Sequence, residues 1–213
     1  MSPALKSITR KCRRARHFAL RLVNDRRGVA AIEFAMIVPI MLVLFFGTVE
    51  LSSGVAASRK VSLMARTLSD LTSRSATVSD SLLTNFFAAG GAIMTPYVPP
   101  IYNVTNGTIT ELWIDPSTGN ARVQWSKGSA ALAQKSLVSI PPDLIVKDAA
   151  GNVVPNQYLI FSQVNYLYKP TVGYVMAPAG VTLSDVSYTR PRQTVCVIYP
   201  PPTSGALPPC PML

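Results

Sequence analysis

The chain has 213 residues, of which 48% are hydrophobic, so it can bury the core of one modest domain, and disorder throughout is excluded. Its net charge of +10 is unevenly spread: residues 1–28 hold nine Lys or Arg and one acid, whereas the rest hold eleven Lys or Arg and nine acids, which argues against a nucleic-acid-binding face. The one histidine, His17, lies in the basic segment, and the remainder shows no recognisable catalytic, metal or cofactor pattern.

The first predicted element is a membrane-spanning helix. Residues 29–49 are apolar apart from Glu33, and at about 1.5 Å per residue they span roughly 31 Å, the thickness of a bilayer core. Basic residues such as Arg26 and Arg27 keep the preceding segment in the cytoplasm. We therefore expect a basic cytoplasmic leader (1–28) and a transmembrane helix (29–50). A cleaved secretory signal is the competing interpretation, although the apolar stretch is long for a signal core.

Two amphipathic helical segments are expected over residues 51–94. The transmembrane helix is predicted to continue with a one-sided apolar stripe, more often a core-facing seam than a binding site, made of Ala57, Val61, Met64, Leu68 and Leu71. A second helix is predicted to start at Ser79 or Asp80 and to end at Gly90-Gly91. Its apolar side consists of Leu82, Leu83, Phe86 and Phe87.

Residues 95–199 are typical of strands separated by Pro and Gly. Strands at 109–114 and 121–125 flank a turn, and the second is expected to place on one face Ala121, Val123 and Trp125. A strand at 158–169 is expected to place on one face Val164, Tyr166 and Tyr168. Further strands are predicted at 172–176 and 194–199.

The predicted fold is therefore α+β: a long N-terminal transmembrane and amphipathic helix, then a small antiparallel β-rich domain against which the helices pack. A Pro-rich tail follows over residues 200–213. Cys196 and Cys210 can form a disulfide if this part is outside the cytoplasm, which in the chain-entropy model stabilises by about 3 kcal/mol. Two free thiols are the alternative.

The junction between the basic leader and the apolar helix is the most informative segment for function. Glu33 is a carboxylate five residues into an apolar span, and an acid embedded in a membrane is by default a functional candidate. The alternative is a Glu close enough to the headgroups to stay hydrated. Pro39 cannot donate a hydrogen bond to Ala35, so a bend is expected there, although a tolerated membrane-helix proline is an equal alternative.

The run Arg26-Arg27-Gly28-Val29-Ala30-Ala31-Ile32-Glu33-Phe34 resembles the processing site of type IV-like prepilins. More narrowly, residues 26–60 resemble the N-terminus of TadE-like and TadG-like minor pseudopilins of tight-adherence (Tad, Flp) pili. The resemblance implies cleavage between Gly28 and Val29 by a prepilin peptidase of the inner membrane. It also implies that Glu33, then the fifth residue, compensates the new Val29 amine of a neighbouring subunit during assembly, and that Val29 is the residue methylated.

Two features depart from the major Flp pilins. Phe34 stands where they have Tyr after the Glu, and the part after Gly28 is much larger than a major pilin, which favours a minor subunit. The expected protein is thus a non-enzymatic, cofactor-free subunit of the bacterial inner membrane with a periplasmic domain. Its expected partners are the membrane, the prepilin peptidase, other pilin and pseudopilin subunits and the Tad assembly machinery, in surface adhesion. The alternative is an uncleaved, signal-anchored periplasmic binding or interaction protein.

Overall fold

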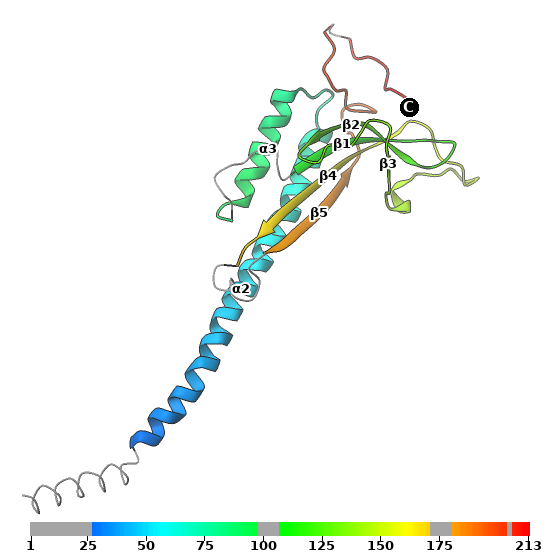
Figure 1. The fold of residues 1–213 in the computed structure, drawn as a ribbon. Coiled ribbons are helices and arrows are strands. Elements are labelled where there is room, and N and C mark those ends of the chain that lie inside the picture. The colour runs from blue at the N-terminus through cyan, green and yellow to red at the C-terminus, as the bar shows by residue number, and fades with distance from the viewer. Residues whose placement is uncertain (1–26, 98–106, 171–179, 204–205) are drawn as a thin grey trace, which may run out of the picture. The chain divides into compact units, whose positions relative to one another are not determined.

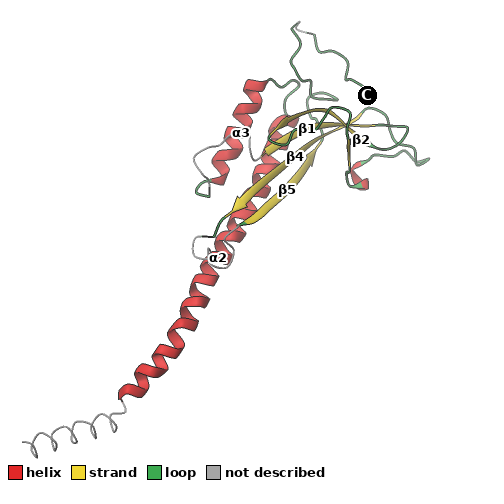
Figure 2. Cartoon of the chain, in the orientation of Figure 1, coloured by secondary structure: helices red, strands yellow, loops and turns green. Residues whose placement is uncertain are grey.

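The computed structural model describes residues 27–97, 107–170, 180–203 and 206–213. It divides into two units, Met1–Val49 and Glu50–Leu213. The leader through Arg26, the side chain of Arg27 and the strand predicted at 172–176 lie outside the described residues. The α+β architecture predicted from the sequence is confirmed: a long N-terminal helix and a second helix are followed by an antiparallel sheet (Figures 1 and 2).

Helix α2 extends from Arg27 to Ser73, so the apolar segment and the amphipathic segment after it form one helix, as predicted. The helix continues past Pro39. In the first unit its apolar side chains are exposed on all sides, among them Ile32, Phe34 and Leu44. By length and composition α2 is a candidate membrane span. A helix that is apolar all round needs lipid or other protein around it, which is consistent with membrane anchoring.

In the second unit, α2 buries one side against the domain. Four residues of the predicted stripe are buried: Ala57, Val61, Met64 and Leu68. The fifth, Leu71, is only partly buried, because at 3.6 residues per turn it lies at the edge of the stripe. The buried side is completed by small residues, Ala65, Ser69 and Thr72, which leave room for the sheet to lie close to the helix.

Helix α3 runs from Asp80 to Met94 and begins where the sequence predicts. Ser79 is its N-cap, and the Ser79 hydroxyl accepts a hydrogen bond of 3.2 Å from the backbone N–H of Leu82. The predicted end is wrong, because α3 passes through Gly90 and Gly91 without interruption.

The role of Gly90 is close packing rather than helix termination. A β-carbon on Gly90 would lie 3.2 Å from both Leu68 Cδ2 and Met64 Cγ of α2. The missing side chain therefore allows α3 to approach α2. Gly107 serves the same purpose at the start of the sheet, since a β-carbon there would lie 3.1 Å from the ring of Phe87.

The sheet has five strands among the described residues, in the order β3-β2-β1-β4-β5, and all neighbouring pairs are antiparallel. The strands are β1 (Gly107–Ile114), β2 (Ala121–Gly128), β3 (Leu137–Val138), β4 (Gln157–Tyr168) and β5 (Val181–Thr189). A short 3-10 helix, η1 (Pro142–Leu144), lies between β3 and β4. In Figure 1, β4 and β5 lie alongside the C-terminal half of α2, and α3 lies next to the C-terminal end of α2.

A β-bulge overturns the predicted facing of β2. Glu111 pairs with Trp125, but Leu112 pairs with Val123, so Gln124 is the extra residue. Val123 consequently belongs to the apolar cluster on the outer face of the sheet, with Ala121, whereas Trp125 belongs to the cluster beneath the helices. The predicted common face of Val164 and Tyr166 is confirmed, since both contact the cluster beneath the helices.

The last predicted strand, at 194–199, is wrong. In this segment only Ile198 forms a bridge, to Thr77, and the strand that follows β4 in the sheet is β5, which the sequence pattern did not predict. Ile198 N–H donates to Ala76 O (3.1 Å), and Val78 N–H donates to Ile198 O (3.0 Å). The backbone of Ile198 therefore pairs with the loop between the two helices and not with a strand of the sheet.

Candidate functional site

The residues that the sequence singles out for processing and assembly lie at the beginning of α2. Gly28 and Val29 are its second and third residues, and Glu33 and Phe34 follow in the next turn. All four are exposed, and no heavy atom outside the local helix lies within 4 Å of where a Gly28 β-carbon would be.

Val29 and Glu33 are four residues apart, which places them on the same side of the helix about 6 Å apart along its axis. Within the described ranges no ion pair involves Glu33. In a low-dielectric surrounding an ionised carboxylate is costly unless a cation lies beside it. The geometry thus offers a carboxylate next to the position at which cleavage after Gly28 would create an amine.

Residues 28–68 match the family model of TadE-like proteins. The matched segment is TadE-like, and it begins at Gly28, the first residue of the Gly-to-Glu spacing. This supports a Tad pilus-associated protein, a structural and non-enzymatic kind of protein. No curated protein and no solved structure matches the chain.

The match ends at Leu68, which is the last buried residue of the predicted apolar stripe. It therefore covers the exposed apolar part of α2 and most of the part that packs on the domain, but not the last turn of α2, α3 or the sheet.

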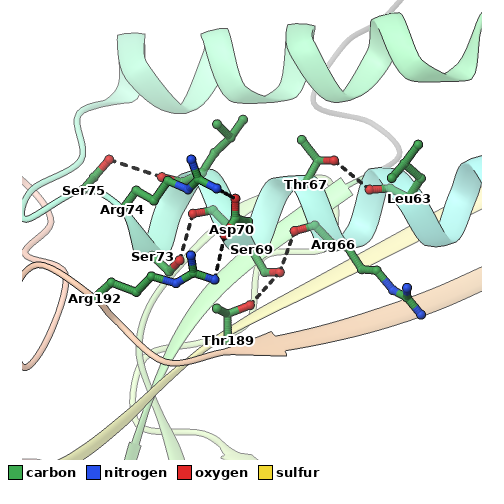
Figure 3. A network of polar contacts seen from close by, with 11 residues as sticks. Leu63, Arg66, Thr67, Ser69, Asp70, Ser73, Arg74, Ser75, Thr189 and Arg192 are labelled. Atoms are coloured by element: carbon green, nitrogen blue, oxygen red, sulfur yellow. Dashed lines mark hydrogen bonds and ion pairs between the residues drawn. The ribbon is translucent and has the colours of Figure 1, made fainter.

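Polar contacts fasten the end of α2 to β5 and the segment after it (Figure 3). The buried Ser69 hydroxyl lies 2.9 Å from both the Ser187 and the Thr189 hydroxyls. Asp70 forms ion pairs with Arg74 (2.6 Å) and Arg192 (2.9 Å). The ion pairs are partly exposed and contribute little, whereas the buried hydroxyl contacts contribute about 1 kcal/mol each.

Lys60 joins the end of α3 to α2. Its Nζ donates to the carbonyl oxygens of Ile93 (2.8 Å) and Thr95 (2.7 Å), which belong to the last turn of α3 and its C-cap. A cation at this place satisfies carbonyls that lack helical partners and complements the helix dipole. The same ammonium lies 6.0 Å from the centre of the Tyr97 ring.

Glu111 is a buried carboxylate that the sequence pattern does not single out. Its side chain is 1% exposed and accepts hydrogen bonds from Trp125 Nε1 (2.8 Å) and Val197 N–H (2.5 Å). Burial raises the pKa of Glu111 to about 8, and the hydrogen bonds from Val197 and Trp125 offset part of this rise. The signal in the sequence is an acid at an inward position of an apolar strand, between Ile109 and Trp113.

The C-terminal segment is attached to the same region. A disulfide joins Cys196 and Cys210, with α-carbons 5.8 Å apart. Tyr158 Oη (3.1 Å) and Gln124 Nε2 both donate to the carbonyl oxygen of Pro211. Glu111, the disulfide and these two bonds hold Val197, Cys210 and Pro211 on the sheet, so this group stabilises the domain.

Three acids of the domain that could contribute to an enzymatic site lie in different elements. Asp115 occupies the turn between β1 and β2, Asp143 lies in η1 and Asp185 in β5. Asp115 accepts hydrogen bonds from Ser117 and Thr118 within its own turn, which lower the pKa of its carboxyl. Across the part of the chain that the structure describes, no three His, Cys, Asp or Glu side chains could hold a metal ion.

Proposed function

We propose that this chain is a minor pseudopilin of a Tad-type pilus. The observation that carries the proposal is the start of the TadE-like match at Gly28, with Glu33 five residues later in an otherwise apolar, exposed helix. In this proposal a prepilin peptidase cleaves between Gly28 and Val29. The chain then consists of a membrane helix and a domain that does no chemistry itself and supports adhesion of the cell to surfaces.

The proposed location is the bacterial inner membrane, crossed once by α2, with the N-terminus in the cytoplasm and the domain in the periplasm. The nine basic residues before Gly28 support this orientation. The Cys196–Cys210 disulfide supports it too, since disulfides persist in the periplasm and rarely in the cytoplasm.

The proposed role of Glu33 is to set the position of the subunit during assembly. Cleavage creates an α-amino group at Val29, and a charge buried in lipid without a partner costs several kcal/mol. The Glu33 carboxylate of a neighbouring subunit offsets that cost only at one axial register. Other pilin and pseudopilin subunits are therefore the partners, together with the Tad assembly machinery.

The test is processing of the full chain. Co-expression with a prepilin peptidase should yield a membrane protein with Val29 as its N-terminus. Its mass should be about 3 kDa lower, because the 28 residues removed are part of a chain of 213 residues and 22.9 kDa. Gly28→Val should block the mass change, because a branched side chain hinders approach to the backbone. The matched control is Gly47→Ala, since Gly47 lies in the same helix and a β-carbon placed on it would likewise have no heavy atom within 4 Å outside the local helix.

Retention of the basic leader, in cells where the peptidase processes an authentic prepilin, would contradict the proposal. That result would favour the uncleaved, signal-anchored periplasmic binding or interaction protein, which uses the same helix as a permanent anchor.

A further inference from the structure

The domain carries a cluster of tyrosines at the end where it joins the apolar helix. Tyr168, the last residue of β4, donates its hydroxyl to Glu50 Oε2 (3.1 Å), and its ring would lie 3.7 Å from a β-carbon on Gly54. The rings of Tyr97 and Tyr168 meet edge to face, 6.4 Å between centres. Tyr166 donates its hydroxyl to Tyr97 O.

Exposed apolar side chains adjoin this cluster along the chain or across the sheet. Val181, the first residue of β5, pairs with Tyr168 and is 49% exposed, and Leu167 is 47% exposed. On α2, Leu51 is 71% exposed and Val55 is also exposed. Lys169 follows β4 and is exposed. We call Leu51, Val55, Leu167, Lys169 and Val181 the rim.

Chain connectivity fixes the distance between the rim and the end of the apolar segment. Glu50 follows Val49 directly, so its α-carbon lies about 3.8 Å from that of Val49 whatever direction the helix takes. Gly54 is four residues further, about 6 Å along the helix. Tyr168 contacts both Glu50 and Gly54, and Val181 is its strand partner.

The polar layer of a bilayer is thick enough to contain these residues. A hydrocarbon core of about 30 Å within a total of about 40–45 Å leaves roughly 5–8 Å of headgroups on each side. The composition also fits, because tyrosine is enriched at this level, and a lysine stem can lie along apolar surface while its ammonium reaches phosphate.

We propose that the rim lies in the phospholipid headgroup layer, so that the domain rests on the bilayer at the ends of β4 and β5. This proposal depends on the membrane anchoring in the proposed function but not on processing at Gly28. The occupant is lipid, because Tyr168, which lies between Leu167 and Lys169 and pairs with Val181, is hydrogen-bonded to Glu50, the residue that directly follows the first unit.

The test uses the full chain in vesicles of phosphatidylethanolamine and phosphatidylglycerol. A Cys12→Ser background removes the one cysteine outside the disulfide, and single environment-sensitive fluorophores are attached to Lys169→Cys or Val181→Cys. The control is Ala150→Cys, because Ala150 is exposed in the loop before β4. This loop leads to Gln157, the first residue of β4, which lies about 36 Å along the strand from Tyr168. Met41→Cys reports on the span itself.

Nitroxide-headgroup lipids should quench the labels at 169 and 181 several-fold more than the label at 150, and aqueous iodide should quench 150 several-fold more than 169. If the label at 41 lies in hydrocarbon while 169 and 181 behave like 150, the rim proposal is overturned and anchoring stands. If 41 is also accessible to iodide, anchoring fails and the rim proposal with it. Protection of the label at 169 from both quenchers that is lost on dilution of protein in lipid would show a second copy as the occupant, and would also overturn the rim proposal.

Discussion

Glu33 and Glu111 are both carboxylates in apolar stretches, but the sequence signal is strong for Glu33 and weak for Glu111. Glu33 is visible because it interrupts a long apolar run next to basic residues. Glu111 lies in β1, whose sequence pattern does not show which face of the strand is exposed to solvent. Its burial depends on Val197, 86 residues later, and on a bulge that turns Trp125 toward it. Pairings over such distances cannot be read from local patterns.

At the residue scale, Glu33→Ala and Glu33→Gln should leave membrane insertion unchanged but lower incorporation into pili. The loss should be on the order of tenfold or more, because an uncompensated amine costs more than the roughly 1.4 kcal/mol that corresponds to a factor of ten. The measurement is the amount of subunit in sheared pili relative to the membrane. Thr48→Ala, on the same exposed helix, is the control and should assemble normally. Unchanged incorporation of both Glu33 variants would rule out the register role.

Glu111 makes the stability of the domain depend on pH. Its pKa is about 8 when folded and about 4.5 when unfolded, so between these values the folded state binds a proton that the unfolded state releases. The contribution of Glu111 to the free energy of unfolding should be greatest below pH 4.5 and fall, by at most about 1.4 kcal/mol per pH unit, as the pH rises toward 8. Urea unfolding of the detergent-solubilised chain at several pH values measures this slope.

Glu111→Gln should flatten the pH slope, since an amide does not titrate. It should also lower stability below pH 4.5, because the amide NH₂ replaces one of the two acceptor oxygens that face Trp125 and Val197. Asp143→Asn, at an exposed acid, is the control and should keep the wild-type slope. An unchanged slope in Glu111→Gln would show that another group causes the pH dependence.

At the scale of elements, periodicity predicted those with strong patterns. The course of α2, the start of α3 and strands β1, β2 and β4 follow from apolar spacing and from the Ser79 cap. The missed strand, β5, is an edge strand in which Ser, Thr and Asp alternate with apolar residues only weakly, and its stability comes from pairing with β4 and from Ser69 on α2. The segment 194–199, which was wrongly predicted as a strand, contains apolar residues because Val197 is buried, not because the segment joins the sheet.

The glycine pair in α3 was predicted to end the helix because glycine weakens helices, yet tertiary packing decided the outcome. Gly90→Leu should therefore destabilise the domain by about 1–3 kcal/mol through overpacking against Leu68 and Met64. Ala89→Leu is the matched control, since Ala89 is the exposed neighbour on the same helix. Urea midpoints of the two variants give the comparison, and equal midpoints would contradict the packing role of Gly90.

At the scale of the whole molecule, the proposed processing site and most of the folded domain lie in different parts of the chain. The TadE-like part, residues 28–68, contains the proposed processing site and the helical seam, whereas the sheet and the disulfide-bonded C-terminal segment lie outside the match. The hypothesis of a processing site comes from the composition of the leader and the apolar helix, because such a site depends on local charge and length. The arrangement of the domain depends on contacts between distant segments, which local patterns predict only in outline.

The pairing of one subunit's Val29 amine with the next subunit's Glu33 is tested most directly by zero-length cross-linking of assembled pili with a membrane-permeant carbodiimide. Wild-type chain is co-expressed with Glu33→Gln chain, whose Val29 amine can form an amide with a Glu33 carboxylate only if that Glu33 belongs to another subunit. Mass spectrometry should find the Val29 amine of the Glu33→Gln chain joined to Glu33 of the wild-type chain. Processed subunits in pili that give no such peptide, under conditions where Glu33 itself is modified by the reagent, would contradict the pairing.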